Sequence, residues 1–503
     1  MKKIILAFIL GILTFNLVGC SNNKSSWQDE KYEKTIDVTG AKLVNEGKLT
    51  VALSPDYAPY EFLDLTKSGI AQFNGSDVYF ASYLAQNFGL ELDIIQMSFD
   101  NLFATLTTNK ADIVISGLTY SSERAENYGL TKSYYDDGEG GQVLICSKED
   151  VDKFKTLDDL NKSNIKISAQ NNSLQMDLVK EFLPSAQIDL IQSIPDGLTK
   201  IKQDKVDALA ISELAALTVV EENSDFVIIP NVSFPTEESG LIACVSKSNT
   251  VLLEKVNLAI SNLAENQYYT WFEVSKALAN ELSIDSSSNF FTITIKLVKN
   301  YGLQFLEGIG ITLSLSLISV LFGTIIAIFI TFLKRNSFKP LNALATVYVE
   351  FIRGIPLLLL LWFIYLAAPS NWPPFISVAV ALFLNSAAYV SEIIRAGINA
   401  VPKGQFEAAS CLGLTKFQTM HKIIIPQALK NILPALGNEF VMLIKETSLA
   451  SVFFVGDLMT IKNNITSLTY LSLEPFVIVG AIYFVLTFSI SKLVKHFEER
   501  MSA

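Results

Sequence analysis

The chain has 503 residues, of which 50% are hydrophobic and 18% are charged, so it is too apolar for an ordinary soluble enzyme and too charged for a protein lying wholly in lipid. Residues 21–300 carry 40 acidic and 23 basic side chains, whereas residues 301–503 carry 10 and 14. An acidic soluble half would repel phosphate, which argues against nucleic acid as a partner. The split predicts a soluble module of about 250 residues followed by a membrane module of about 200.

The start of the chain predicts an export signal. Two lysines precede an apolar stretch, residues 4–18, that is shorter than the roughly 20 residues needed to span a bilayer. The Leu-Val-Gly-Cys run that ends at Cys20 resembles a bacterial lipobox, which implies lipidation of Cys20. The alternatives are a simple signal peptide over residues 1–20 or an uncleaved anchor. The polar residues 21–45 are expected to form a flexible tether.

The stretch from residue 48 to about residue 280 alternates strand-like and helix-like runs, which is the pattern of parallel α/β sheets. Strands are expected over residues 49–53, 92–95 and 111–116, and helices over residues 77–88 and 99–109. In open α/β sheets a ligand binds at the carboxyl ends of the strands. The loops to inspect are therefore residues 54–60, 98–101 and 117–124.

Arg124 is the single arginine within residues 21–300, in a chain that uses lysine for most of its basic side chains. A guanidinium binds a carboxylate through a planar fork that lysine cannot reproduce. Because Arg124 follows a strand-end loop, we expect it to hold the carboxylate of a ligand. The alternative is a surface ion pair with Glu123 or Glu126.

Two motifs give this half a family resemblance. They are Tyr57-Ala-Pro-Tyr-Glu-Phe62 and Ser116-Gly-Leu-Thr-Tyr-Ser-Ser-Glu-Arg124, and they resemble the solute-binding proteins of polar amino-acid ABC importers. The resemblance implies two α/β lobes that close on an amino acid. It places the binding domain at residues 46–280, with lobe 1 at about 46–138 and 243–280 and lobe 2 at about 142–238.

The same resemblance assigns roles to residues of lobe 1. Tyr57 would stack on the ligand, and Phe99 would form the opposite wall of the site. The α-carboxylate and α-amine would be held by Gly117, Thr119 and Arg124. A zwitterion needs such a combination of a cationic fork, polar acceptors and an aromatic sandwich.

Lobe 2 departs from the family pattern. The family's Gly-Thr-rich loop before a helix is replaced by Ala-Gln-Asn-Asn-Ser at residues 169–173. A helix N-terminus still offers backbone N–H groups to an anion, so the candidate contacts there are Asn171, Asn172 and Ser173.

The acidic groups of the family's site are also replaced. Ser212 stands where the family has the aspartate that binds the ligand ammonium, and its neighbour Glu213 is the alternative acceptor. Ser54 stands where the family reads basic side chains, which disfavours arginine, lysine or histidine as the ligand. Asp56 lies close enough to keep that question open.

Cys146 and Cys244 have similar apolar flanks after a glycine, which suggests matched strands where the chain crosses between the lobes. A disulfide between them and two buried free thiols are both compatible with the sequence.

No catalytic constellation can be built outside the membrane. Residues 21–300 contain no histidine, which excludes Ser/His/Asp and Cys/His arrangements. The Gly-x-x-x-x-Gly-Lys-Ser/Thr phosphate loop is absent from the sequence, so ATP hydrolysis is expected in a separate subunit. No cluster has metal-ligand spacing, and neither a metal nor a cofactor is predicted.

The second half predicts an all-α membrane domain after a linker at residues 281–300. Five apolar segments near the spanning length lie at residues 309–333, 345–367, 375–394, 432–455 and 475–493. Lysine and arginine gather after the first, third and fifth segments, which are the cytoplasmic loops if the binding domain is exported. The loop after the fourth segment contains one basic residue, Lys462.

The loop between the third and fourth segments carries a permease motif. Glu407, Ala408 and Ala409, with Gly413 six residues after Glu407 and an Ile-Pro pair further on, resemble the EAA motif of bacterial ABC-importer permeases. The family implies a coupling helix over about residues 403–414 that docks into a cytoplasmic ATPase. The alternative is a generic amphipathic helix.

Polar and ionisable residues within or next to the apolar segments are candidates for a polar translocation path, because charges at membrane depth usually face a cavity or a partner helix. They include two acid–base pairs with i,i+3 spacing, Glu350/Arg353 and Glu392/Arg395. The candidates are Glu350, Arg353, Asn385, Glu392 and Glu439. The alternative is ion pairing near the cytoplasmic edge.

Together these features predict a two-lobed type II periplasmic-binding-protein fold fused to an all-α domain of five transmembrane helices. The resemblance implies a multi-pass protein of the bacterial plasma membrane, with the receptor outside. Two copies would form the pore, each bound to one ATPase subunit, for a glutamine-like polar amino acid. The alternatives are a ligand-gated channel, a transmembrane sensor and an anchored extracellular enzyme.

Overall fold

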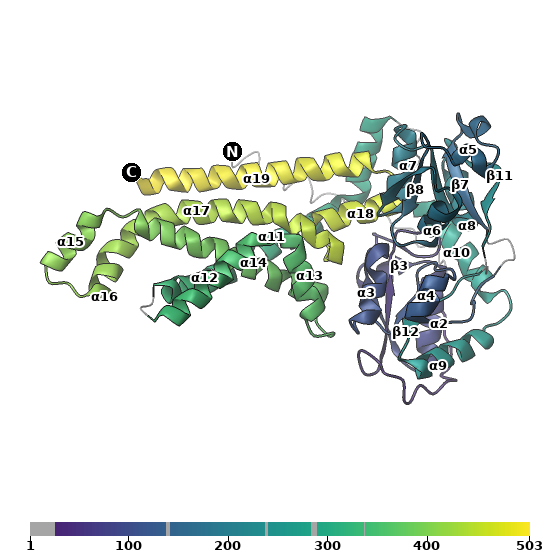
Figure 1. The fold of residues 1–503 in the computed structure, drawn as a ribbon, viewed down its shortest axis with the longest axis horizontal. Helices are drawn as coiled ribbons and strands as arrows, with labels where there is room; N and C mark the ends of the chain where they lie inside the picture. The colour runs from purple at the N-terminus through teal and green to yellow at the C-terminus, as the bar shows by residue number, and fades with distance from the viewer. Residues whose placement is uncertain (1–25, 137–140, 237–239, 283–288, 336–337, 503) are drawn as a thin grey trace.

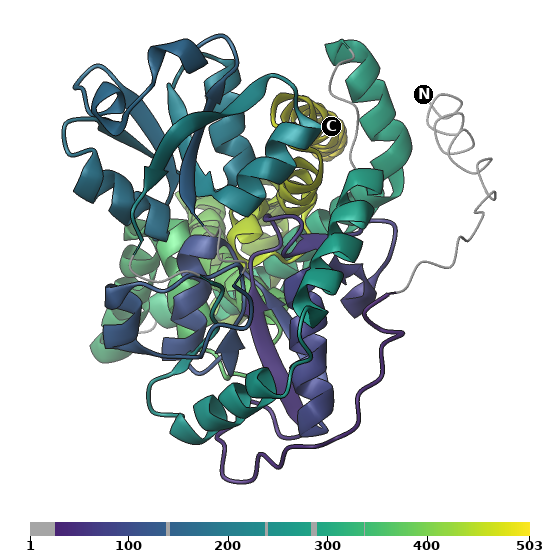
Figure 2. The same ribbon diagram turned by 90° about the vertical axis from the view of Figure 1, so that its right-hand side faces the viewer.

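The computed structural model describes residues 26–136, 141–236, 240–282, 289–335 and 338–502 (Figure 1). Two α/β lobes lie at one end of the molecule, and a bundle of long helices extends from them (Figure 1). Viewed from the lobe end, lobe 2 lies above lobe 1 with the helices behind them (Figure 2). The predicted combination of an α/β two-lobed domain and a helical membrane domain is confirmed.

Lobe 1 is built on a five-stranded sheet in the order β4-β1-β5-β12-β6. Its strands are β1 (Lys48–Leu53), β4 (Glu91–Gln96), β5 (Ile113–Val114), β6 (Tyr128–Leu130) and β12 (Cys244–Ser246), with a separate hairpin of β2 (Phe62–Leu63) and β3 (Phe73–Asn74). Its helices are α2 (Ser76–Phe88), α3 (Leu102–Thr107), α4 (Ser122–Asn127), α9 (Thr250–Ser261) and α10 (Gln267–Leu282). Strand β1 pairs in parallel with β4 and β5, so their carboxyl ends meet at one edge.

Local chemistry sets the bounds of these elements. Helix α2 carries Asp77 in its first turn, where a carboxylate faces the positive end of the helix dipole, and it stops at Gly89, whose φ is 70°. The helix predicted over residues 99–109 is shorter, because it begins as a 3-10 turn over Phe99–Asn101 and α3 ends at Thr107. The strand predicted over residues 111–116 is reduced to β5.

Lobe 2 has a five-stranded sheet in the order β11-β7-β10-β8-β9. Its strands are β7 (Gln142–Ser147), β8 (Lys166–Gln170), β9 (Gln187–Ile191), β10 (Ala208–Ser212) and β11 (Phe226–Phe234). Its helices are α5 (Leu157–Leu160), α6 (Leu174–Phe182), α7 (Ile194–Lys202) and α8 (Glu213–Glu222). The chain passes between the lobes twice, from β6 to β7 and from β11 to β12.

The prediction of a flexible tether is wrong for residues 26–45, because apolar side chains among them are buried in lobe 1. Trp27 is buried and donates its indole N–H to the carbonyl oxygen of Phe73 at 2.7 Å. Ile36 is buried as well, and Thr35 bonds to Asn87 through its hydroxyl at 2.7 Å. The tether was predicted from the polar average composition of this segment, which does not reveal that single apolar residues such as Trp27 and Ile36 are buried. Cys20 and the signal segment lie outside the described residues.

The membrane half consists of helices α11 (Phe290–Lys334), α12 (Lys339–Gly354), α13 (Leu357–Ala367), α14 (Pro374–Asn399), α15 (Lys403–Cys411), α16 (Lys416–Thr419), α17 (Ile425–Glu446), α18 (Leu458–Thr469) and α19 (Leu473–Ser502). Within the described residues, α11, α14 and α19 are long and apolar enough to cross a membrane, and α12 with α13 forms a bent pair that could make a fourth span. The count of five spans therefore stays a prediction.

Three predicted boundaries in this half are wrong. The linker at residues 281–300 overlaps α11, which is helical from Phe290 onward. The segment at residues 345–367 bends by 112° between α12 and α13, because Pro356 pushes the preceding residue, Ile355, into an extended conformation. The segment at residues 432–455 leaves the α-helix after Glu446 and continues as a 3-10 helix over Thr447–Phe453.

Candidate functional site

The two lobes are in contact across the cleft between them. Side-chain hydrogen bonds join Tyr57 Oη with Ser212 Oγ at 2.5 Å, Asn172 Nδ2 with the Asp100 carbonyl oxygen at 3.1 Å, and Gln170 Nε2 with Asp56 Oδ2 at 3.4 Å. Arg124 Nη2 reaches the carbonyl oxygen of Asn172 at 3.5 Å. Each bond joins one lobe to the other, so the two lobes are closed on each other.

Arg124 lies in the first turn of α4 at this interface, held there because the Ser121 hydroxyl accepts a hydrogen bond from its backbone N–H at 3.2 Å. The side chain is 7% exposed, and its Nη1 donates to the carbonyl oxygen of Thr119 at 2.7 Å. Among the described residues its guanidinium has no carboxylate partner, so the alternative of a surface ion pair with Glu123 or Glu126 is wrong.

A buried guanidinium without an anion is unfavourable, because desolvation penalises the charge and the carbonyl oxygens of Thr119 and Asn172 offset only part of that cost. Burial accordingly lowers the pKa of Arg124, although an arginine remains charged at any physiological pH. The remaining hydrogen-bonding capacity of the fork is therefore available to a carboxylate that enters the cleft.

Arg124 borders a small cavity between the two lobes. Its lining comprises Tyr57, Phe99, Gly117, Thr119, Arg124, Gln170, Leu174, Gln175 and Ile194. The structure thus brings together the five residues that the sequence motifs assign to the lobe 1 side. Four of these lining residues are not among the candidates named from the sequence. Gln170 lies inside the loop at residues 169–173, whereas Leu174 and Gln175 follow that loop and Ile194 begins α7.

Gly117 permits the close approach of the Tyr57 ring. Its φ is +54°, and a Cβ atom there would lie 3.0 Å from Cδ1 of Tyr57. Its backbone N–H donates to Asp77 Oδ2 at 2.6 Å. Asp77 also accepts from the hydroxyls of Tyr134 at 2.9 Å and Tyr268 at 2.6 Å, so a buried carboxylate fixes the loop that carries Gly117. Burial raises the pKa of Asp77.

The predicted contacts at residues 171–173 do not line this cavity. The backbone N–H of Asn171 bonds to the carbonyl oxygen of Ile191 at 2.9 Å, and that of Ser173 faces the carbonyl oxygen of Gln170 at 3.2 Å. Ser173 caps α6 by accepting from the Met176 N–H at 3.2 Å. Since the protein itself occupies these groups, Asn171 and Ser173 serve lobe 2, whereas Asn172 joins the two lobes.

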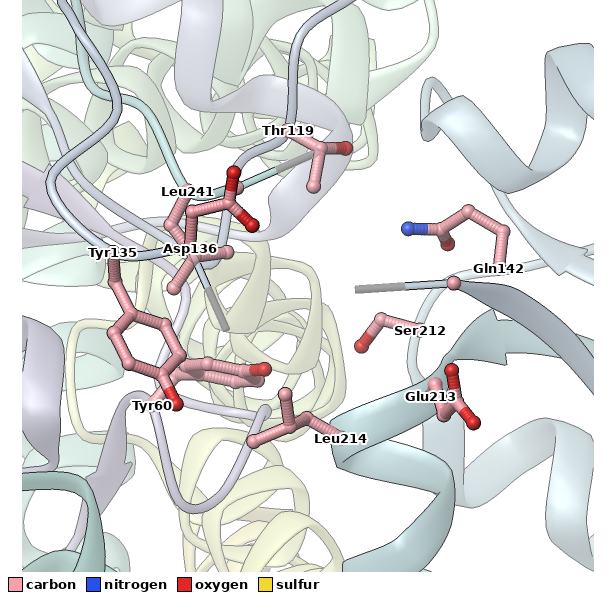
Figure 3. Close-up of a pocket in the computed structure, with 11 residues that line it drawn as sticks. Tyr60, Thr119, Tyr135, Asp136, Gln142, Ser212, Glu213, Leu214 and Leu241 are labelled. Carbon is pink, nitrogen blue, oxygen red and sulfur yellow. The ribbon is translucent and has the colours of Figure 1, made fainter. Parts of the chain in front are cut away.

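Ser212 and Glu213 line a second pocket beside the first, shown in Figure 3. There the lobe 2 residues, which also include Gln142, face Thr119 and Asp136 of lobe 1 (Figure 3). Thr119 borders both pockets. An acidic surface formed by Asp136 and Glu213 therefore adjoins the Arg124 cavity without entering it.

Asp56 contacts the cavity residue Gln170 but does not itself line the cavity. It accepts a hydrogen bond from Ser54 Oγ at 2.6 Å and from Gln170 Nε2 at 3.4 Å. Burial raises the pKa of this carboxyl to about 7. Near neutral pH, Asp56 is therefore divided between its neutral and ionised forms.

The two cysteines are free and buried in different sheets, Cys146 in β7 and Cys244 in β12. The disulfide alternative is therefore wrong, and each thiol fills an apolar core. Burial raises the pKa of both thiols to about 12, which keeps them unreactive.

At the opposite end of the molecule, α15 carries the permease motif (Figure 1). Ala409 is buried, whereas Glu407 and Ala408 are exposed. Gly413 ends this helix with φ +71°, and the N–H of Leu414 bonds to the carbonyl oxygen of Ala409 at 3.1 Å. The large side chains of Leu412 and Phe417 beside it are 77% and 78% exposed, a feature that the motif alone does not reveal.

The candidate polar residues of the membrane half divide into separate groups. Glu392 forms ion pairs with Arg395 at 2.5 Å and with Lys334 of α11 at 2.7 Å. Glu350 and Arg353 form no ion pair within the described residues, and Arg353 lies over the ring of Tyr389, 5.4 Å from its centre. The predicted pairing of Glu350 with Arg353 is therefore wrong.

A further group lies where α14 meets α17. Asn385 Nδ2 faces Glu446 Oε2 at 3.5 Å, and Glu439 is 5% exposed. Glu439 and Asn385 are thus buried polar groups on neighbouring helices, unlike the exposed Glu350 and Arg353.

Comparison with known proteins divides the chain in the same way. Residues 49–273 match the family described as bacterial extracellular solute-binding proteins, family 3. Residues 290–503 match the binding-protein-dependent transport system inner membrane component.

Named relatives resemble the membrane half. A permease protein of Rickettsia bellii (strain RML369-C), whose name assigns it to glutamine transport, is 42% identical over 39% of this chain and 91% of its own length. The arginine transport system permease protein ArtQ of Bacillus subtilis (strain 168) is 41% identical over 39% of this chain and 92% of its own length.

A solved structure is also similar to this chain. An amino acid ABC transporter substrate-binding protein from Streptococcus pneumoniae Canada MDR_19A, solved with L-arginine, is 32% identical over 46% of this chain and 95% of its own length, with a TM-score of 0.43.

Proposed function

The chain belongs to the polar amino-acid ABC importers, and we propose that it captures and imports a glutamine-like amino acid. It joins the solute-binding and permease domains of these importers in one polypeptide. It is a transporter subunit rather than an enzyme. The observation that carries the ligand assignment is Arg124, a buried guanidinium without a carboxylate partner among the described residues, at the wall of the cavity between the lobes.

The ligand carboxylate binds the free edge of the Arg124 fork, where charge-assisted hydrogen bonds are strongest. The rings of Tyr57 and Phe99 enclose the aliphatic part of the ligand. Thr119 supplies a polar acceptor for the ammonium on the side that adjoins Asp136 and Glu213. The side-chain amides of Gln170 and Gln175 then remain to contact the ligand side chain. A ligand that itself carries an amide would satisfy both the donors and the acceptors of these two glutamines.

Asp56 provides a test of the side-chain class. Its carboxyl has a pKa of about 7 because of burial; it is therefore largely neutral at pH 6 and largely ionised at pH 8. Only the ionised form attracts a cationic side chain. We expect the affinity for L-lysine to rise about tenfold from pH 6 to pH 8, whereas the affinity for L-glutamine stays constant and exceeds that for lysine at pH 6. Isothermal titration calorimetry at both pH values measures these affinities.

The matched control is Asp56→Asn, which keeps the shape of the side chain and removes its titration. This variant should abolish the pH dependence of lysine binding and leave glutamine binding unchanged. Lysine binding more tightly than glutamine at both pH values would contradict the assignment of a neutral ligand.

The partner proposed for α15 is a cytoplasmic ABC ATPase. Supporting this are the exposed Glu407 and Ala408, and the exposed apolar side chains of Leu412 and Phe417 in the same region. Large apolar groups that remain exposed together are typical of a surface that another protein covers. A second copy of the chain would complete the pore, so the working unit is a homodimer with two ATPase subunits.

We place the receptor domain outside the bacterial plasma membrane, in line with the distribution of basic residues in the helical half. A ligand-gated channel is disfavoured because, among the described residues, the candidate spans follow the complete pair of lobes. The ATPase-docking motif would also have no use in a channel. Glu439 and Asn385 are proposed to line the translocation path, since both are buried where α14 and α17 pack together.

A further inference from the structure

Lys462 is the one basic residue that the sequence has in the loop after the fourth predicted segment. It lies on α18, the short helix between the helical bundle and the lobes (Figure 1). The side chain is 4% exposed, with Nζ 3.9 Å from the centre of the Phe476 ring. Its Nζ donates a hydrogen bond to Asn463 Oδ1 at 3.4 Å. Lysine is rarely buried to this degree without a charge of opposite sign nearby.

The acidic group on the neighbouring helix of lobe 2 is Asp196, whose Oδ2 accepts a hydrogen bond from the Ser193 hydroxyl at 2.9 Å. It faces Lys462 across the interface without a direct ion pair among the described residues. Burial lowers the pKa of Lys462, and the negative charge of Asp196 in lobe 2 opposes that shift. Asp196 lies in the first turn of α7, which packs against α18. Asp196 and Phe476 border one gap between lobe 2 and the permease domain.

The first turn of α7 also reaches the amino-acid cavity. Ile194, two residues before Asp196, lines that cavity. The position of Asp196 therefore depends on whether lobe 2 has closed over the ligand.

Lobe 1 contacts the permease domain independently. Gln96 Nε2 donates to Asn464 Oδ1 of α18 at 3.2 Å, and Lys110 Nζ donates to the carbonyl oxygen of Ala368 at 3.2 Å, just after α13. With lobe 1 held at these points, opening of the cleft would carry lobe 2, and Asp196 with it, away from α18. A helix that contacts both lobes at once can therefore distinguish a closed receptor from an open one.

We propose that Lys462 attracts Asp196 across the interface between the domains, and that this contact is how the permease domain recognises lobe 2 of the closed receptor. The proposal rests on the proposed import function, in which the closed receptor delivers its ligand to the permease. It explains why a loop otherwise without basic residues retains a buried lysine.

Charge reversal in the full chain, reconstituted in lipid nanodiscs, tests the contact by hydrogen exchange. Lys462→Glu should speed amide exchange in both α7 and α18, on the order of fivefold, because like charges would then face each other across the interface. Asp196→Lys should have the same effect. The double variant Lys462→Glu/Asp196→Lys should restore slow exchange in both helices.

The matched control is Lys180→Glu, which makes the same charge change on α6 of lobe 2, where the lysine pairs with Asp177; it should leave α18 unchanged. Faster exchange in α18 alone, without rescue by the double variant, would show that Lys462 serves only the packing of its own helix and would overturn the proposal. The exchange is followed with saturating L-glutamine, because the contact is expected only when the cleft is closed. A wild type that bound no glutamine would count against the proposed function, whereas a glutamine-bound chain whose α7 and α18 exchange alike in the wild type and in both charge reversals would overturn this contact alone.

Discussion

Replacement of Arg124 by alanine is expected to lower the affinity for the amino acid by about two to three orders of magnitude. Removing one partner of a buried, hydrogen-bonded charge pair costs roughly 2–5 kcal/mol, and every 1.4 kcal/mol is about a tenfold change in the dissociation constant. The loss is large because the ligand carboxylate would still be buried but would face no cation. Calorimetric titration of L-glutamine into the full chain measures it, and circular dichroism verifies the fold.

Arg124→Lys separates the charge from the shape of the guanidinium. Lysine keeps a positive charge but cannot form the two-pronged contact, so its affinity should fall between those of the wild type and of Arg124→Ala. Lys48→Ala is the control, since Lys48 forms an exposed pair with Glu91 on the rim of lobe 1, and it should bind as the wild type does. Unchanged affinity in a folded Arg124→Ala variant would remove the basis for the site.

The second large effect is expected at the end of α15. Gly413→Val should abolish ATP-driven transport while leaving amino-acid binding intact. Gly413 has φ +71°, and no atom lies within 4 Å of the position that a Cβ would occupy. The effect is therefore backbone strain alone, about 1–2 kcal/mol for a residue forced into the left-handed region, and more for a β-branched one. Relief of that strain would redirect α15, which carries Glu407 and Ala408.

Gly413→Asn is the matched variant, because asparagine tolerates the left-handed conformation better than other side chains do. It should retain most of the transport activity, since its side chain enters open space. Calorimetry on the same preparations reports binding. Equal loss of transport in both variants would point to a steric clash with the partner rather than to the turn.

The lobe 1 side of the cavity could be predicted from sequence because its residues follow parallel strands. The carboxyl ends of β1, β4 and β5 meet at one edge of the sheet, and this geometry brings Tyr57, Phe99 and the loop of Gly117 together. The distribution of arginine then singled out Arg124 within that edge.

The lobe 2 side was harder to predict because its contribution depends on how far the lobe rotates, which no local pattern encodes. Backbone N–H groups near Asn171 and Ser173 look available in sequence, yet neighbouring carbonyl oxygens accept from them. Gln170 instead enters the cavity from the end of β8. The burial of Trp27 was missed for a similar reason, since its partner in the core is 46 residues away.

The membrane half shows the same limit. Apolar runs located the long helices, but the bend at Pro356 and the exposure of Glu350 depend on tertiary packing. Helix α17 is not among the helices of the described residues that are long and apolar enough to cross a membrane, and it carries the charged residues Lys430, Glu439 and Glu446.

The most direct test of the account is the accumulation of labelled L-glutamine in proteoliposomes that contain the full chain together with its ATPase subunit. The account predicts uptake against the gradient that requires ATP and both proteins, and that Arg124→Ala eliminates. Downhill flux of amino acid or ions through the chain alone, gated by glutamine and indifferent to ATP, would contradict it.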